Sequence, residues 1–94
     1  MVELTSQQKT YFRGRAQRIG ATGAVGKAGL TDAVAGTISR LLDRHELVKI
    51  NIPAGPGEER QAMADALAQA TGAALIAVVG RMVVLYRPKA DAST

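Results

Sequence analysis

The residues best suited to chemistry lie in one short segment, Gly26-Lys27-Ala28-Gly29, which Val25 precedes. Glycine lets a backbone approach a ligand closely and adopt positive φ angles, so this segment suits a loop that carries a cation. Leu30-Thr31-Asp32 follows at once, and Thr31 is a good N-cap for a helix with an acidic residue in its first turn. A glycine loop at the positive end of a helix is a suitable place for a phosphate group.

A G-x-x-G pattern also occurs in plain turns, and that interpretation stays open from the segment alone. Two better-known phosphate loops do not fit. A Walker A motif needs four residues between its glycines and a hydroxyl residue after the lysine, but Ala28 follows Lys27 here. The dinucleotide pattern G-x-G-x-x-G is absent as well. The remaining chemistry is that of a loop that clamps nucleotide backbone, as G-x-x-G loops do in KH domains.

The sequence offers little for catalysis. It has no cysteine and a single histidine, His45, which excludes disulfides, thiolate chemistry and a histidine metal cluster. His45 beside Glu46 could form an acid–base pair, but a histidine at the end of a helix more often complements the helix dipole. We therefore expect a non-catalytic protein with no cofactor, no metal and no small-molecule substrate.

The positive charge is concentrated in the first third of the chain. The net charge is +4, and residues 1–30 hold five Lys or Arg against one acid, whereas residues 31–94 hold seven of each sign. This distribution favours an anionic partner, with nucleic acid first, although a basic face can also simply keep a protein in solution. The cations that would extend the contact surface, if the first helix lies beside the loop, are Lys9, Arg13 and Arg18. Three later cations, Lys49, Arg81 and Arg87, are expected to be solvated.

The chain is expected to be one cytoplasmic domain. No apolar run reaches the length of a membrane span, and the first six residues lack the basic and apolar regions of a signal peptide. A length of 94 residues suits a single domain, here predicted over residues 3–89 with a polar tail at 90–94.

Capping and periodicity predict the elements that must position the loop. Thr5 and Gln8 form a capping box, and Tyr11 and Phe12 are expected in the core. Helices are predicted over residues 6–18, 32–44 and 58–70, and strands over 20–25, 47–52, 75–79 and 82–87. In the strand at 47–52 apolar and polar residues alternate, so we expect one buried and one polar sheet face. Gly80-Arg81 predicts a hairpin with a type II′ turn.

The order α-β-α-β-α-β-β predicts a single α/β domain with two layers. Its sheet would have four strands in mixed orientation, with the helices packed against it.

The chain resembles the YhbY family, which consists of stand-alone bacterial CRM (chloroplast RNA splicing and ribosome maturation) domains. The resemblance covers roughly residues 3–89. It rests on Leu4-Thr5 with Gln8-Lys9, on residues 25–32, on 43–50, on Thr71-Gly72-Ala73 and on 79–88. It implies a fold similar to the C-terminal domain of bacterial translation initiation factor three. It also implies RNA binding through Gly26, Lys27, Ala28 and Gly29, and association with precursors of the large ribosomal subunit.

Two functions follow as hypotheses. The first is a non-catalytic protein that binds structured ribosomal RNA, mostly through backbone and shape, because exposed stacking aromatics are scarce in the sequence. The second is a protein-interaction or small-ligand regulatory domain that uses the sheet edge or an exposed sheet face, which for a ligand would need a concave apolar pocket.

Overall fold

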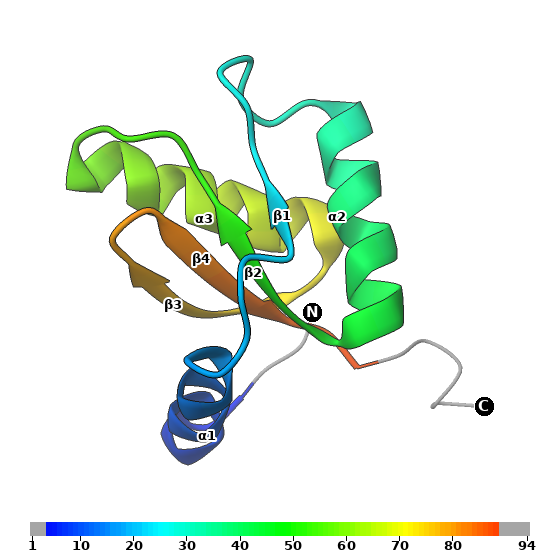
Figure 1. Cartoon of the computed structure of the whole chain (residues 1–94), viewed down its shortest axis with the longest axis vertical. Coiled ribbons are helices and arrows are strands. Elements are labelled where there is room, and N and C mark those ends of the chain that lie inside the picture. Colours follow the sequence, from blue (N-terminus) through cyan, green and yellow to red (C-terminus); the bar gives the residue numbers. More distant parts are fainter. Residues whose placement is uncertain (1–3, 89–94) are drawn as a thin grey trace.

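The computed structural model describes residues 4–88, so the polar tail expected at 90–94 lies outside the described part. The order of elements is the predicted one (Figure 1). In chain order they are α1 (Ser6–Ala16), β1 (Gly23–Ala24), α2 (Asp32–His45), β2 (Leu47–Asn51), α3 (Gly57–Thr71), β3 (Ala74–Val79) and β4 (Met82–Tyr86).

The four strands form one mixed sheet with the spatial order β1-β2-β4-β3. β1 and β2 run parallel and are connected through α2, as parallel neighbours require a crossover, whereas β4 is antiparallel to both β2 and β3. The predicted hairpin joins β3 and β4 through Gly80 and Arg81. Gly80 has a φ of 58°, the positive sign that a type II′ turn needs at its first central position.

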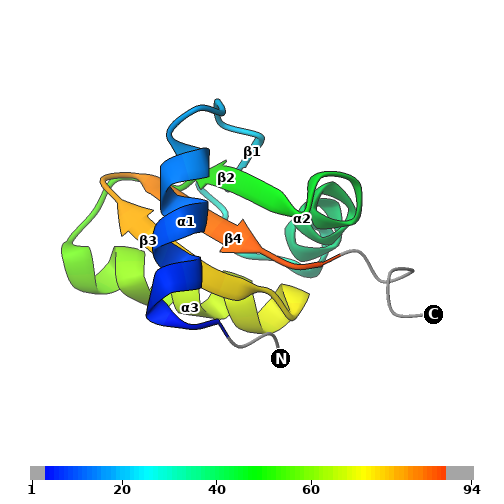
Figure 2. The ribbon, with the colours of Figure 1, turned by 90° about the horizontal axis from the view of Figure 1, so that it is seen from below.

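Helices cover both faces of the sheet, so the domain has three layers and not the two that the sequence suggested (Figure 2). α2 and α3 bury the face that carries Val48 and Ile50. α1 buries the opposite face, where Leu47 and Val84 lie. The expectation of a polar second face was wrong because it rested on β2 alone. β3 and β4 are almost continuously apolar, as strands buried on both faces are.

The larger core, between the sheet and the pair α2 and α3, holds the domain together. Its largest fully buried side chains are at most 1% exposed, and burying one aliphatic side chain of this size contributes roughly 1.5–3 kcal/mol. They include Ile38, Leu42, Leu67, Val83 and Leu85.

β1 is much shorter than the predicted strand at 20–25. A Cβ at Gly23 would come within 2.9 Å of the Leu41 side chain, so a small residue is needed for β1 to pass α2. Small residues give a strand little to pack with, and the ladder continues only through the N–H groups of Thr22 and Val25. These donate to carbonyls at the β2 side over 2.7 and 2.8 Å.

α1 begins as predicted and ends two residues earlier than expected. The capping box is present, with Gln8 N–H donating to Thr5 Oγ1 at 3.1 Å and Thr5 N–H donating to Gln8 Oε1 at 2.8 Å. Ala16 is buried at the last turn, and Phe12 stacks on Tyr86 with ring centroids 4.1 Å apart. These contacts fix the orientation of α1 on the sheet.

Candidate nucleic-acid interface

Residues 26–29 form a tight turn that projects from one end of the molecule, between β1 and α2 (Figure 1). The Gly29 N–H donates to the Gly26 carbonyl at 3.0 Å, and Gly29 has a φ of 80°. Gly26 has no such requirement, because its φ is not positive and a Cβ there would meet no atom within 4 Å. The folded chain therefore needs glycine at position 29 but not at position 26.

The turn presents free hydrogen-bond donors to solvent. Within residues 4–88, the backbone N–H groups of Gly26, Lys27 and Ala28 donate no hydrogen bond, and all three residues are exposed. Successive free N–H groups in a turn form a concavity that suits an anion. The ammonium group of Lys27 adds a positive charge to the same short segment.

α2 starts directly after the turn and directs its positive end toward it. Thr31 is the N-cap as predicted, and its hydroxyl accepts a hydrogen bond from Val34 N–H at 3.2 Å. The helix runs 14 residues, so its dipole adds to the attraction of an anion near residues 26–29.

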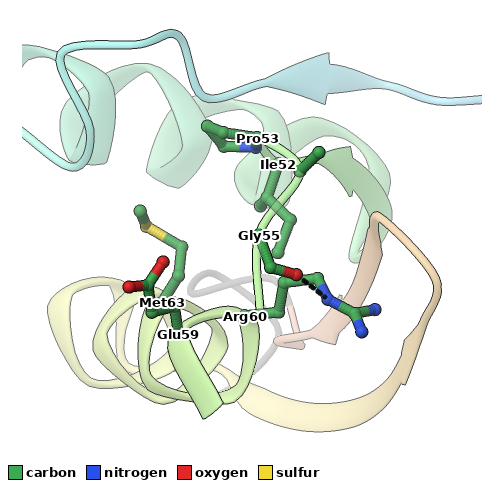
Figure 3. A pocket seen from close by; sticks show the side chains of 7 residues that line it. Ile52, Pro53, Gly55, Glu59, Arg60 and Met63 are labelled. Atoms are coloured by element: carbon green, nitrogen blue, oxygen red, sulfur yellow. Dashed lines mark hydrogen bonds between the residues drawn. The ribbon is translucent and has the colours of Figure 1, made fainter. Parts of the chain in front are cut away.

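The segment that follows β2 and the β3–β4 hairpin lie at the same end of the sheet, because β2 ends where its antiparallel neighbour β4 begins. Arg60 holds the segment after β2 by donating from Nε to the Gly55 carbonyl at 3.1 Å (Figure 3). Its Nη1 also donates to the Gly80 carbonyl. Arg81 Nε donates to the Ile52 carbonyl at 3.2 Å. Both guanidinium groups thus connect the segment after β2 to the β3–β4 hairpin at this end of the sheet.

A small hollow lies between α3 and the segment after β2, with Glu59 and Met63 directed toward it (Figure 3). Its volume is about 80 Å³. Pockets that bind small molecules usually enclose roughly 300–1,000 Å³. This hollow is therefore too small to enclose a typical small-molecule ligand.

The structure does not bring the cations of the first helix next to the turn. Lys9, Arg13 and Arg18 are exposed on α1 or just after it, as predicted. α1, however, lies at the opposite end of the longest dimension of the molecule, which measures 38 Å (Figure 1). It packs against β2, β3 and β4 on one face of the sheet, while the turn extends beyond the end of β1. The α1 cations therefore form a second surface.

Two residues of this second surface were not predicted from the sequence as contact residues. Tyr11, expected in the core, is 60% exposed, because adjacent helical residues are rotated by about 100° and Phe12 occupies the inner side. Arg15 was not among the predicted contact residues, although it is exposed on the same helix. Its guanidinium carbon lies 5.9 Å from the centroid of the Tyr11 ring. The i, i+4 spacing of these two residues was the available signal.

Besides Arg81, the other two cations that were expected in solvent have structural roles instead. Lys49 Nζ donates to the carbonyls of Ala16 at 3.1 Å and Ile19 at 3.2 Å, where α1 ends. The side chain of Arg87 is 19% exposed and pairs with Asp43 at 2.8 Å. Neither group is available as a phosphate contact without loss of these bonds.

Neither a candidate metal-binding cluster nor a membrane-spanning helix occurs in the part of the chain that the structure describes. Residues 4–88 contain no group of three His, Cys, Asp or Glu side chains that could hold a metal ion. None of the helices described is long and apolar enough to cross a membrane.

Comparison with known proteins identifies relatives along nearly the whole chain. The CRS1/YhbY (CRM) domain family matches residues 4–87. A Haemophilus influenzae protein named "RNA-binding protein" is 33% identical over 92 residues, which cover 98% of this chain and 93% of that protein. The Bacillus subtilis "Probable RNA-binding protein YqeI" is 30% identical over 84 residues, covering 89% of this chain and 88% of its own. The solution structure of the Staphylococcus aureus protein SAV1595 superposes with a TM-score of 0.83 at 31% identity, covering 93% of this chain and 91% of that chain.

Proposed function

Because the chain belongs to the CRS1/YhbY (CRM) domain family, we propose that it is a non-catalytic protein that binds structured ribosomal RNA. It contacts the RNA through residues 26–29 and through the basic surface of α1. It acts in the cytoplasm, in maturation of the large ribosomal subunit, as the resemblance of its motifs to the YhbY family implies. Relatives named as RNA-binding proteins support the RNA as partner.

The observation that carries this proposal is the unexplained glycine at position 26. Neither the backbone angle nor the surrounding space requires glycine there, while Gly29 is required by its φ of 80°. A missing side chain beside three free N–H groups leaves room for a phosphate to approach the backbone. Close approach of a phosphate would account for glycine at this position, and this supports the proposal.

The contacts expected at the turn are with the sugar–phosphate backbone. Backbone N–H groups and the Lys27 ammonium recognise phosphate oxygens and carry no sequence information by themselves. Recognition then depends on where the phosphates lie, which is a property of folded RNA. A structured RNA fits this arrangement better than an extended single strand.

The α1 cations supply the second contact. α1 contains no acidic residue, so the positive charges of Lys9 and Arg13 in the helix, and of Arg18 just after it, are not offset by acids of the helix. Since α1 and the turn lie at opposite ends of the molecule, one RNA must reach both ends to use both surfaces. An RNA with two phosphate segments held apart by its own fold meets that condition.

A binding titration at stepped salt concentrations tests the turn. The full chain and the variant Lys27→Gln are titrated with a structured fragment of large-subunit ribosomal RNA. We expect the variant to bind more weakly across RNA sequences and to lower the slope of log K against log salt by about 1. Arg44→Gln is the matched control, because Arg44 is exposed in the last turn of α2 and removes the same charge away from residues 26–29.

If both variants bind the RNA as tightly as the wild type, Lys27 makes no contact with the RNA and the turn is not part of the interface. Equal losses in both variants would mean that only net charge matters. Co-sedimentation of the protein with precursors of the large subunit, in preference to finished subunits, tests the cellular role. Sedimentation with neither would contradict it.

A further inference from the structure

The outer surface of α1 carries an aromatic ring in an unusual setting. The Tyr11 side chain is 60% exposed. Among the large apolar side chains of residues 4–88, only Val79 is as exposed. The Tyr11 ring meets the edge of Phe12 at 5.2 Å, with the ring planes 69° apart. Phe12 in turn stacks on Tyr86, so the ring of Tyr11 rests on a fixed base. The exposed ring is therefore supported from the side of the sheet.

Beside the ring lies an open hollow of about 490 Å³. We call this surface the Tyr11 platform, and its residues are Tyr11, Gly14, Arg15, Gln17 and Arg18. Two guanidinium groups and one aromatic ring therefore border the same space. Aromatic rings and Arg side chains together are the groups on which nucleobases stack in proteins that bind single-stranded nucleic acid.

Gly14 lies within the platform, and the fold does not account for it. It occupies a position inside α1, where glycine is less favourable than alanine. A Cβ at this position would meet no atom within 4 Å, so close packing within the chain does not require the glycine. A ligand that lies flat against the helix would require it.

We propose that the Tyr11 platform binds one unpaired nucleotide of the RNA. Its base stacks on the Tyr11 ring above Gly14 and displaces the Arg15 guanidinium that lies over that ring, and its phosphate then lies beside Arg15 and Arg18. This inference rests on the proposed RNA-binding function and adds a preference to it. The protein then favours RNAs that present an unpaired nucleotide, such as a loop or a bulge, next to paired segments.

The test compares two RNAs. One is a hairpin with 2-aminopurine in its unpaired loop, and the other is a fully paired duplex of the same length. On the hairpin, binding of the wild-type chain is expected to change the fluorescence of 2-aminopurine. Tyr11→Ala is expected to weaken hairpin binding by roughly 5- to 100-fold, as loss of one stacked base does, and to leave duplex binding unchanged. Tyr11→Phe keeps the ring and is expected to recover most of the lost affinity.

Gly14→Ala provides a second variant, since it adds only a methyl group to the hollow and favours the helix. It is expected to weaken hairpin binding without lowering the unfolding temperature. If Tyr11→Ala binds the hairpin like the wild type, or loses equal affinity for both RNAs, the platform does not hold a base and the inference is wrong, while RNA binding stands. If the wild type binds neither RNA, the proposed function itself fails.

Discussion

Substitution of Arg87 tests whether a cation with several hydrogen bonds inside the protein stabilises the fold and takes no part in RNA binding. The Arg87 guanidinium group joins the end of β4 to both helices of the larger core. Nη1 donates to Ser39 Oγ at 3.0 Å and to the Thr71 carbonyl, and Nη2 donates to the Ser39 carbonyl at 2.7 Å and to Asp43 Oδ1 at 2.8 Å. Truncation by Arg87→Ala would leave two part-buried carbonyls and one hydroxyl without this donor.

The expected decrease in the free energy of unfolding of Arg87→Ala follows from these hydrogen-bond partners. The Asp43 side chain is 57% exposed, so the ion pair contributes at most about 1 kcal/mol. An unsatisfied carbonyl costs about 1–3 kcal/mol, and partial access of water places these two near the lower end. The sum is roughly 2–4 kcal/mol of unfolding free energy, which is a large part of the ~5–15 kcal/mol typical of a small domain. It corresponds to a fall of roughly 10–25 °C in unfolding temperature.

Urea unfolding followed by circular dichroism measures this cost, with Asp43→Asn as the matched control. We expect Asp43→Asn to cost less than about 1 kcal/mol, because it removes only the exposed ion pair. At a temperature where Arg87→Ala is folded, its RNA binding should show the same salt slope as the wild type. A cost below about 0.5 kcal/mol, or a lower salt slope, would refute the structural role assigned to Arg87.

Two further predictions concern the end of α1 and the turn. Lys49→Met should lower the unfolding free energy by about 1–2 kcal/mol, because two carbonyls at the end of α1 lose their donor. Hydrogen exchange should show α1 opening more readily than α3, and equal protection of the two helices would count against the prediction. Gly26→Ala should raise the unfolding free energy by about 0.4–1 kcal/mol while weakening RNA binding. Gly29→Ala should lower it by about 1–2 kcal/mol because its φ of 80° disfavours a side chain. If urea unfolding gives the same change in stability for the two alanine variants, the conclusion that the fold requires glycine at position 29 but not at position 26 is wrong.

Local rules predicted most of the elements of this fold. The capping box at Thr5, the N-cap at Thr31 and the hairpin at Gly80 each depend on residues within a few positions of one another, and the structure contains all three. The α/β class, the element order and the mixed sheet follow from those elements and their connections.

Features that depend on distant parts of the chain were not predictable in the same way. Lys49 was expected in solvent because its strand alternates, but the end of α1 folds over that face and provides carbonyls for it. The position of α1 relative to residues 26–29 depends on which sheet face the helix covers, and periodicity does not encode that choice. For the same reason the α1 cations and the turn were considered as one surface, whereas the structure separates them.

The most direct test of the RNA-binding site is an NMR titration of the ¹⁵N-labelled full chain with a structured ribosomal RNA fragment. We expect the largest changes in amide chemical shift at residues 26–28 and in the first turn of α2, with a second group along α1. Lys27→Glu should reduce the first group at equal RNA concentration and leave the second group visible. If the RNA shifts the amides of the β3 edge or of α3 while residues 26–31 stay unchanged, the turn is only a turn and the proposed RNA site is wrong.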